Sequence, residues 1–282
     1  MKKLLSLTLG LLLTCSFAGA LSNSEIADGA DYESVVFFMA PSFDKNGQED
    51  ADGLCVGNLV SARVLITAAH CVFMAEVSGV REIDLQVGEY RYVTRPTGES
   101  VRVGYVPVLR QKVKGRIYVP ETLRLKMERQ KFRTSIGPSE DIAVMVFDQE
   151  LSLKENFQFT SVVSRAEYKE IIPQIVRYSP TVITINFIEE MSTNTKRMAV
   201  LDSLKRNMSD HLESKSRSRV QPGDSGSPLF VKIGNRYKQI GVTKGRAETI
   251  FSNWDVFALL GERLCQVAQQ VPHTTDRTVL CP

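Results

Sequence analysis

The chain has 282 residues, a formal net charge of +3 at pH 7 and a hydrophobic content of 43%. The length suits one all-β unit, since such units often run to about 200–250 residues. A net charge this small excludes a dedicated nucleic-acid-binding protein, and the hydrophobic content is ordinary for a soluble globular chain.

Residues 1–20 have the pattern of a secretory signal peptide. Lys2 and Lys3 precede an apolar run from Leu4 to Leu13, and Ala18-Gly19-Ala20 offers a small-residue cleavage site. The apolar run is shorter than the roughly 20 residues of a membrane span. We therefore expect cleavage near Ala20, a secreted or periplasmic protein and no stable membrane anchor. A lipoprotein lipidated at Cys15 is the alternative.

Short apolar runs separated by turn residues predict β-strands along the rest of the chain. These runs are residues 35–39, 59–67, 83–87, 101–109, 142–147, 182–188, 229–233 and 240–243. The stretch Phe257–Gln270 has helical spacing and predicts a closing helix. Two segments resemble insertions: Arg110–Arg133, which we expect to be a solvated basic surface, and Glu213–Arg219, which we expect to be flexible and easily cut.

The segment from Pro222 to Pro228 places Ser225 directly after Asp224 and next to glycines. A serine hydroxyl is a weak nucleophile that needs an adjacent base. Glycines let the backbone turn sharply, so that amide N–H groups can point at a developing oxyanion. The segment therefore predicts a nucleophilic serine, with an ordinary polar turn as the alternative.

Two further residues are candidates for the base and for the group that orients it. His70 follows an apolar run where a strand meets a short turn, whereas His211 and His273 lie in polar surroundings. Asp141 stands at the head of the apolar run 142–147, where a buried carboxylate needs a partner. If each residue is considered alone, His70 could instead be an ordinary core histidine, and Asp141 a strand-start residue that faces solvent.

The order of the histidine, the aspartate and the serine is that of the chymotrypsin-like proteases, and it differs from that of subtilisin and the α/β-hydrolases. The segments Thr67–Cys71, Asp141–Val144 and Gly223–Pro228 resemble the three signature blocks of the trypsin/chymotrypsin family. The resemblance runs from about Ile26 to the C-terminal helix. It implies an all-β fold of two packed six-stranded antiparallel β-barrels, with a C-terminal helix.

The resemblance also implies an exported serine endopeptidase that cuts protein or peptide substrates through an acyl-enzyme intermediate. His70 would be the general base, Asp141 would orient it, and Ser225 would be the nucleophile. The backbone N–H groups of Gly223 and Ser225 would form the oxyanion hole. Ser227 replaces the glycine of the commonest family motif, which resembles bacterial glutamyl-endopeptidase relatives. We expect neither a metal nor a cofactor, and a protein inhibitor is a candidate partner.

The substrate pocket implied by the resemblance is ambiguous. Arg219 falls at the pocket floor, Asp255 aligns near its base, and Thr243, Lys244 and Gly245 form a wall that pairs with the substrate backbone. An exposed arginine favours an acidic side chain before the scissile bond. If Asp255 dominates the pocket, a Lys or Arg side chain before the scissile bond is favoured. If Arg219 and Asp255 pair with each other, the pocket is effectively neutral.

Four cysteines remain after removal of the signal segment, and an even count in an exported chain indicates disulfides. The resemblance pairs Cys55 with Cys71, which leaves Cys265 for Cys281. A zinc site is the alternative, but the cysteines lack the CxxC spacing of such sites.

The resemblance implies activation by cleavage of the Glu25–Ile26 bond. Ile26-Ala27-Asp28-Gly29 is similar to the mature start of the family, whose new α-ammonium would pair with Asp224. Residues 21–25 would then be a short propeptide, and residues 26–282 the protease domain. The alternative is that residues 21–28 form a disordered leader and that activity needs no trimming.

A protease-fold binding protein without turnover is the alternative function. The presence of both His70 and Ser225 favours the enzyme, because inactive relatives in this family commonly lose one of them.

Overall fold

The computed structural model describes residues 21–27, 32–43, 46–48, 53–79, 81–98, 100–186, 195–207, 210–248 and 253–282. The expected signal peptide lies outside these residues, as do Asp28, Gly29 and the last two residues of the predicted strand 182–188. No helix in the described part of the chain is long and apolar enough to cross a membrane.

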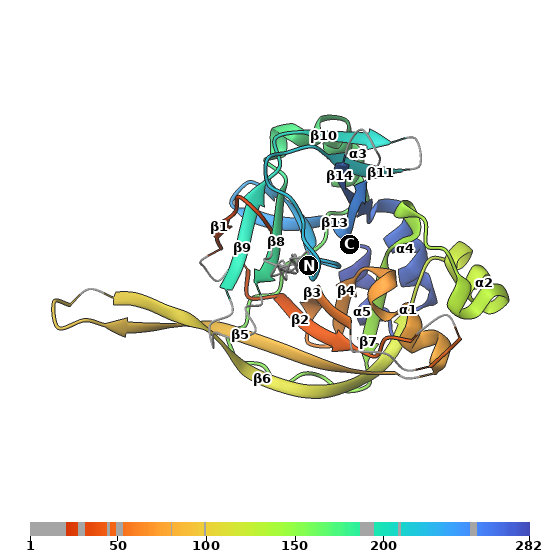
Figure 1. Cartoon of the computed structure of the whole chain (residues 1–282), viewed down its shortest axis with the longest axis horizontal. Helices are drawn as coiled ribbons and strands as arrows, with labels where there is room; N and C mark the ends of the chain where they lie inside the picture. Colours follow the sequence, from red (N-terminus) through yellow and green to blue (C-terminus); the bar gives the residue numbers. More distant parts are fainter. Residues whose placement is uncertain are drawn as a thin grey trace, which may run out of the picture.

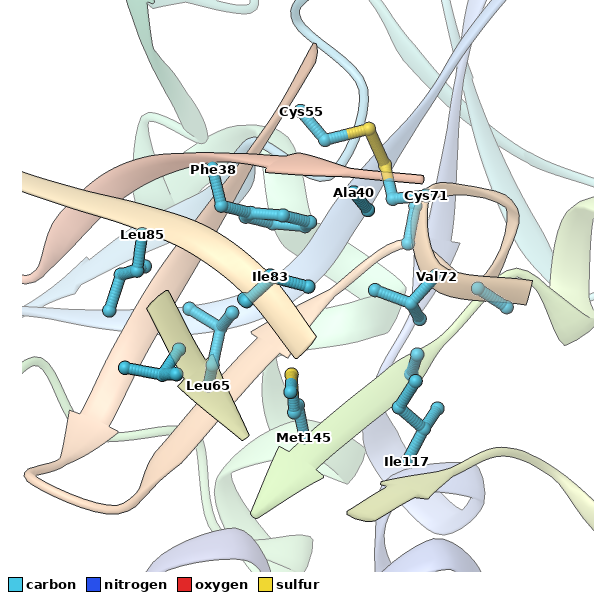
Figure 2. Close-up of a cluster of buried hydrophobic side chains, with 14 of the residues drawn as sticks. Phe38, Ala40, Cys55, Leu65, Cys71, Val72, Ile83, Leu85, Ile117 and Met145 are labelled. Atoms are coloured by element: carbon cyan, nitrogen blue, oxygen red, sulfur yellow. A yellow bond between two sulfur atoms is a disulfide. The ribbon is translucent and has the colours of Figure 1, made fainter. Parts of the chain in front are cut away.

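The N-terminal half is a closed antiparallel β-barrel with the strand order β2-β3-β4-β7-β6-β5 (Figure 1). The strands are β2 (Val35–Ala40), β3 (Gly53–Ser61), β4 (Val64–Thr67), β5 (Glu82–Thr94), β6 (Ser100–Tyr118) and β7 (Ala143–Phe147). The barrel closes because β2 pairs with both β3 and β5. Successive side chains of a strand point to opposite faces, and Phe38, Leu65 and Met145 meet in the core (Figure 2).

The C-terminal half is an antiparallel sheet with the order β1-β9-β8-β12-β13-β14-β11-β10. The strands are β1 (Glu25–Ile26), β8 (Thr181–Asn186), β9 (Thr195–Val200), β10 (Leu204–Asn207), β11 (His211–Ser214), β12 (Pro228–Ile233), β13 (Arg236–Glu248) and β14 (Asn253–Leu259). Val182, Leu229 and Phe257 belong to its buried core. The short strands β1 and β10, which the sequence did not predict, end the sheet on its two sides.

A shared apolar cluster joins the two halves. Val60, Ile66 and Val144 of the barrel belong to the same buried cluster as Val242 and Ala258 of the second sheet. The two halves therefore form one packed unit, and the candidate site lies along their junction.

Helices occupy the connections and the C-terminus. They are α1 (Ala69–Ser78), α2 (Glu121–Gln130), η2 (Lys131–Arg133), η3 (Pro138–Glu140), α3 (Arg165–Ile171), η4 (Ile172–Tyr178), α4 (Gly261–Gln270) and α5 (Thr274–Leu280). The basic segment 110–133 thus contains the end of β6 and the helix α2. Its cations are partly neutralised, since Arg124 pairs with Glu121 and Lys126 pairs with Glu140.

The predicted all-β architecture is confirmed, and each predicted apolar run contains a strand. The first half is the expected six-stranded barrel, whereas the second half is an eight-stranded sheet. The run 59–67 is a hairpin, because β3 ends at Ser61 and β4 begins at Val64. The predicted helix start at Phe257 is wrong. Phe257 pairs with Leu212 on one side and Thr243 on the other, and the helix begins only at Gly261. A short buried strand cannot be told from a helix end by apolar residues alone.

The segment Glu213–Arg219, predicted to be flexible and easily cut, is packed against the fold through alternate side chains. Burial alternates along it: Ser214, Ser216 and Ser218 are buried, whereas Lys215 and Arg217 are exposed. Every second side chain faces inward, as in a strand, although only Glu213 and Ser214 belong to β11. A polar composition concealed this pattern, because the inward side chains are serines that hydrogen-bond within the fold.

Candidate active site

His70 and Asp141 come together because of the way two paired strands end. Thr67 is the last residue of β4 and pairs with Ala143, the first residue of β7. Asp141 precedes β7, and His70 is the second residue of α1, which follows β4. The strand pairing therefore places both residues at one edge of the barrel.

Two hydrogen bonds hold the His70–Asp141 pair. Nδ1 of His70 lies 2.8 Å from Oδ2 of Asp141, and the backbone N–H of His70 donates to Oδ1 at 2.9 Å. The carboxylate is fully buried, whereas the His70 side chain is 32% exposed. Asp141 thus fixes the orientation of the ring through Nδ1, and part of the ring is left accessible to solvent.

Burial by itself would raise the pKa of Asp141. The hydrogen bond from the His70 ring, the charges of His70 and Lys244 and the His70 amide outweigh burial, so the pKa of Asp141 lies below its usual value. Asp141 is therefore a carboxylate at neutral pH, as the group that orients a catalytic base must be.

Ser225 lies in the loop between Gln221 and β12, pinned to both halves of the protein. Its carbonyl accepts a hydrogen bond from Val56 N at 2.8 Å, and Gly226 N donates to Thr243 O at 2.8 Å. Gly226 has a φ of 81°, and a Cβ there would lie 2.1 Å from Val56 O. Only glycine fits so close an approach.

His70 and Ser225 line the same cavity, which has a volume of about 190 Å³. The Cys55–Cys71 disulfide borders it together with Met74. The predicted nucleophile and base thus face one space, next to the orienting aspartate. His211 and His273 are elsewhere, in β11 and just before α5.

Gly223 has a φ of 97°, a conformation that a side chain would strain. Neither its amide nor that of Ser225 has an acceptor among the described residues. The oxyanion hole expected at these two amides stays a prediction.

Asp224 is buried and accepts three hydrogen bonds. Thr184 Oγ1 donates to its Oδ1 at 2.7 Å, and the amides of Gln221 and Leu21 donate to its Oδ2 at 2.8 Å and 3.0 Å. Burial is the largest influence and raises the pKa of Asp224 to about 6, despite these hydrogen bonds. Burial disfavours the charged form of the carboxylate, and the negative charge of Asp255 adds to this effect.

Ile26, the residue expected to contact Asp224, lies elsewhere. It belongs to β1 and pairs with Arg197 of β9. Leu21 takes the expected place, with its side chain only 1% exposed in the core of the second sheet. Ser22 N donates to Arg219 O at 2.9 Å. Residues 21–25, expected to be a propeptide or part of a disordered leader, are thus built into the fold.

The residues expected in the substrate pocket lie close to one another. Nη1 of Arg219 donates to Ser214 O at 3.1 Å and lies 3.9 Å from Oδ2 of Asp255. Asp255 is 1% exposed, and burial raises its pKa to about 6, although Val220 N and nearby arginines oppose this. Thr243 is buried in β13, and a bulge separates it from Gly245.

Lys244 makes a contact that the sequence reasoning missed. Its Nζ lies 3.2 Å from Oδ2 of Asp141 and 3.0 Å from Ile136 O. The sequence assigned Lys244 only to the substrate-binding wall. A lysine directly after the buried run 240–243 was the available signal that its charge has a specific partner.

Both predicted disulfides are confirmed. Cys55 is bonded to Cys71, and Cys265 is bonded to Cys281, each across a sequence separation of 16. Cys55, Cys71 and His70 are also close enough to form a metal-ligand cluster. The two sulfur atoms are already bonded to each other, so they do not provide thiolate ligands.

The closed barrel packed against a second antiparallel sheet is the fold of the chymotrypsin-like serine peptidases. The Trypsin family model matches residues 36–250, and the chain belongs to this family. The comparison with curated proteins found no match.

Proposed function

We propose that the protein is an exported serine endopeptidase that cuts protein or peptide substrates through a His70-Asp141-Ser225 triad. The observation that carries the proposal is the doubly hydrogen-bonded His70–Asp141 pair next to a cavity that Ser225 also lines. A binding protein would not need a buried carboxylate aimed at the inner nitrogen of an accessible histidine.

In the first half of the reaction, Ser225 Oγ attacks the carbonyl carbon of the scissile bond. The hydroxyl proton passes to Nε2 of His70, while Nδ1–H donates to Asp141 and the carboxylate stabilises the imidazolium. The carbonyl oxygen becomes an oxyanion, which the amides of Gly223 and Ser225 bind. The intermediate collapses when His70 gives the proton to the leaving amine, and Ser225 is left acylated.

In the second half, water replaces the amine. His70 accepts a proton from the water as the oxygen attacks the acyl carbon, and then returns a proton to Ser225 Oγ as the acid product leaves. No metal or cofactor is needed for either half, because the base, nucleophile and oxyanion donors come from the chain.

Labelling with a fluorophosphonate tests this proposal. The probe phosphonylates an activated serine, so the wild type is expected to react and Ser225→Ala is not. Ser227→Ala is the matched control, since Ser227 is buried two residues further on and should leave labelling unchanged. Equal labelling of wild type and Ser225→Ala would refute the proposal.

We also propose that removal of the signal peptide after Ala20 produces the active protein without a further cleavage. Cleavage after Ala20 would convert the Leu21 amide into an α-ammonium 3.0 Å from Oδ2 of Asp224. Leu21 has a φ of 28°, which is strained for a leucine, and cleavage would remove the preceding carbonyl and with it the strain. A cation at this point would give the buried carboxylate its missing counter-charge. No later cleavage at Glu25–Ile26 would then be required.

For the substrate, we propose a pocket without a strong charge preference. Arg219 and Asp255 lie 3.9 Å apart, and the aspartate is almost completely buried. Their charges largely cancel for a side chain that enters between them. An uncharged residue before the scissile bond is therefore expected to be preferred.

A further inference from the structure

Lys244 connects the two halves of the protein at the triad. It stands on β13 of the second sheet, whereas Asp141 and Ile136 belong to the connection that leads into the barrel strand β7. Its Nζ is within 3.2 Å of the Asp141 carboxylate and 3.0 Å of the Ile136 carbonyl. The side chain is 27% exposed, so the ammonium is partly withdrawn from water.

Lys244 and His70 share one oxygen of Asp141. Oδ2 lies 2.8 Å from His70 Nδ1 and 3.2 Å from Lys244 Nζ, while Oδ1 accepts the His70 amide at 2.9 Å. The carboxylate therefore contacts the lysine ammonium as well as the histidine ring. A cation at this distance cancels part of the negative charge that would otherwise stabilise a protonated ring.

No other charged group in the described residues makes a comparable contact with Asp141. The neighbouring Glu140 is paired with Lys126 of α2 at 2.5 Å and accepts the Gly137 amide. Thr243, next to Lys244, is buried and its hydroxyl lacks a partner in this part of the chain. The disulfide beside His70 is uncharged.

We propose that Lys244 is a positioning residue that holds Asp141 in place and keeps His70 in its neutral, proton-accepting form at lower pH. This proposal rests on the proposed function. A carboxylate favours protonation of a neighbouring imidazole, and a second cation on the same oxygen weakens that effect. The ring therefore loses its proton at a lower pH, and activity extends further into the acidic range.

Removal of the charge reverses this effect. In Lys244→Met, the full charge of Asp141 acts on His70, so the acidic limb of the pH profile moves upward. We expect a shift of about 0.5–1 pH unit, because the ammonium is partly exposed and its charge is partly screened. Lys244→Arg keeps the charge and is expected to restore most of the wild-type profile.

Lys238→Met is the matched control. Lys238 lies on the same strand, has a similar exposure of 26% and pairs with Glu167 at 2.6 Å, away from the triad. It removes one positive charge from β13 without touching Asp141. Lys244→Gln is a second uncharged variant, in case the methionine disturbs folding.

The experiment measures the rate of fluorophosphonate labelling and the NMR titration of the His70 ring in the same pH series. The proposal predicts that both midpoints rise in Lys244→Met and Lys244→Gln, but not in Lys244→Arg or Lys238→Met. Unchanged midpoints in the uncharged variants, or an equal rise in Lys238→Met, would overturn it. The NMR titration needs no turnover, so it tests Lys244 even if a failure to label the wild type refutes the proposed function.

Discussion

The backbone nitrogen of Leu21 lies 3.0 Å from Oδ2 of Asp224, the residue immediately before the candidate nucleophile. This contact joins the first described residue to the loop that carries Ser225. The expected partner, Ile26, instead pairs with Arg197 at the edge of the second sheet. The state of the Leu21 nitrogen, amide or ammonium, therefore affects the candidate oxyanion loop directly.

The first prediction concerns the residue at which the chain begins. A protein that starts at Leu21 should be fully active, because its ammonium reaches Asp224 and its side chain fills the core. A protein that starts at Ile26 should lose most activity, since it lacks the buried Leu21 side chain and the contact with Asp224. N-terminal sequencing and peptidase assays on both forms provide the test, and full activity from Ile26 would contradict it.

The second prediction concerns stability and pH. In a chain that extends before Leu21, the pKa of Asp224 is raised from 3.8 to about 6. The folded state then binds more protons than the unfolded state between these values, so the free energy of unfolding falls as the pH rises through this window. The loss approaches about 3 kcal/mol above pH 6, at 1.36 kcal/mol for each pKa unit.

The chain that starts at Leu21 should not show this loss, because its ammonium favours the ionised carboxylate. Urea unfolding of both forms at pH 4 and pH 7 measures the difference. Asp255 also has a pKa raised to about 6, and its charge acts on Asp224, so the difference between the forms reports on these two carboxylates together. Identical pH dependence in the two forms would show that Leu21 carries no counter-charge for Asp224.

The third prediction compares the two disulfides. Both close loops with a sequence separation of 16, so the chain-entropy model gives each about 3 kcal/mol of stabilisation. Cys55→Ala/Cys71→Ala and Cys265→Ala/Cys281→Ala should therefore lower the free energy of unfolding by similar amounts. Only the first pair borders the cavity of His70 and Ser225, so only its loss should also lower kcat. Equal effects on kcat would argue against this distinction.

The fourth prediction concerns the substrate pocket. Arg219→Ala would remove one of the two arginines that act on the buried Asp255, and a basic substrate side chain could take its place. The variant should gain cleavage after Lys and Arg relative to cleavage after uncharged residues. A peptide panel varied at the position before the scissile bond measures this change. A variant that instead gains cleavage after Glu would contradict the proposed neutral pocket.

Much of the fold could be predicted from the sequence, as could the candidate triad residues, because both depend on local patterns. Apolar runs marked the strands, and His70, Asp141 and Ser225 each stood at the end of such a run or in a glycine-rich turn. The partner of Asp224 could not be predicted in this way. Leu21 is an ordinary apolar residue, and only the three-dimensional path of residues 21–27 brings its nitrogen to Asp224.

Lys244 was missed for a similar reason. Its position after an apolar strand showed that the charge needed a partner, but that partner is 103 residues away in the sequence. Phe257 illustrates the opposite error, where a helical spacing was read into residues that form a buried strand. Local patterns identify elements well, and they say little about which distant side chains the packed halves bring together.

The central claim, that this chain is a peptidase and not a binding protein, is tested most directly by peptide hydrolysis. The chain Leu21–Pro282 and its Ser225→Ala variant would be incubated with the same peptide panel, and cleavage would be followed by mass spectrometry. The proposed mechanism predicts cleavage by the wild type and a loss on the order of 10⁶-fold in kcat for the variant, as triad deletions cause in another protease. Equal rates for the two proteins, or binding of peptides without any cleavage by the wild type, would contradict it.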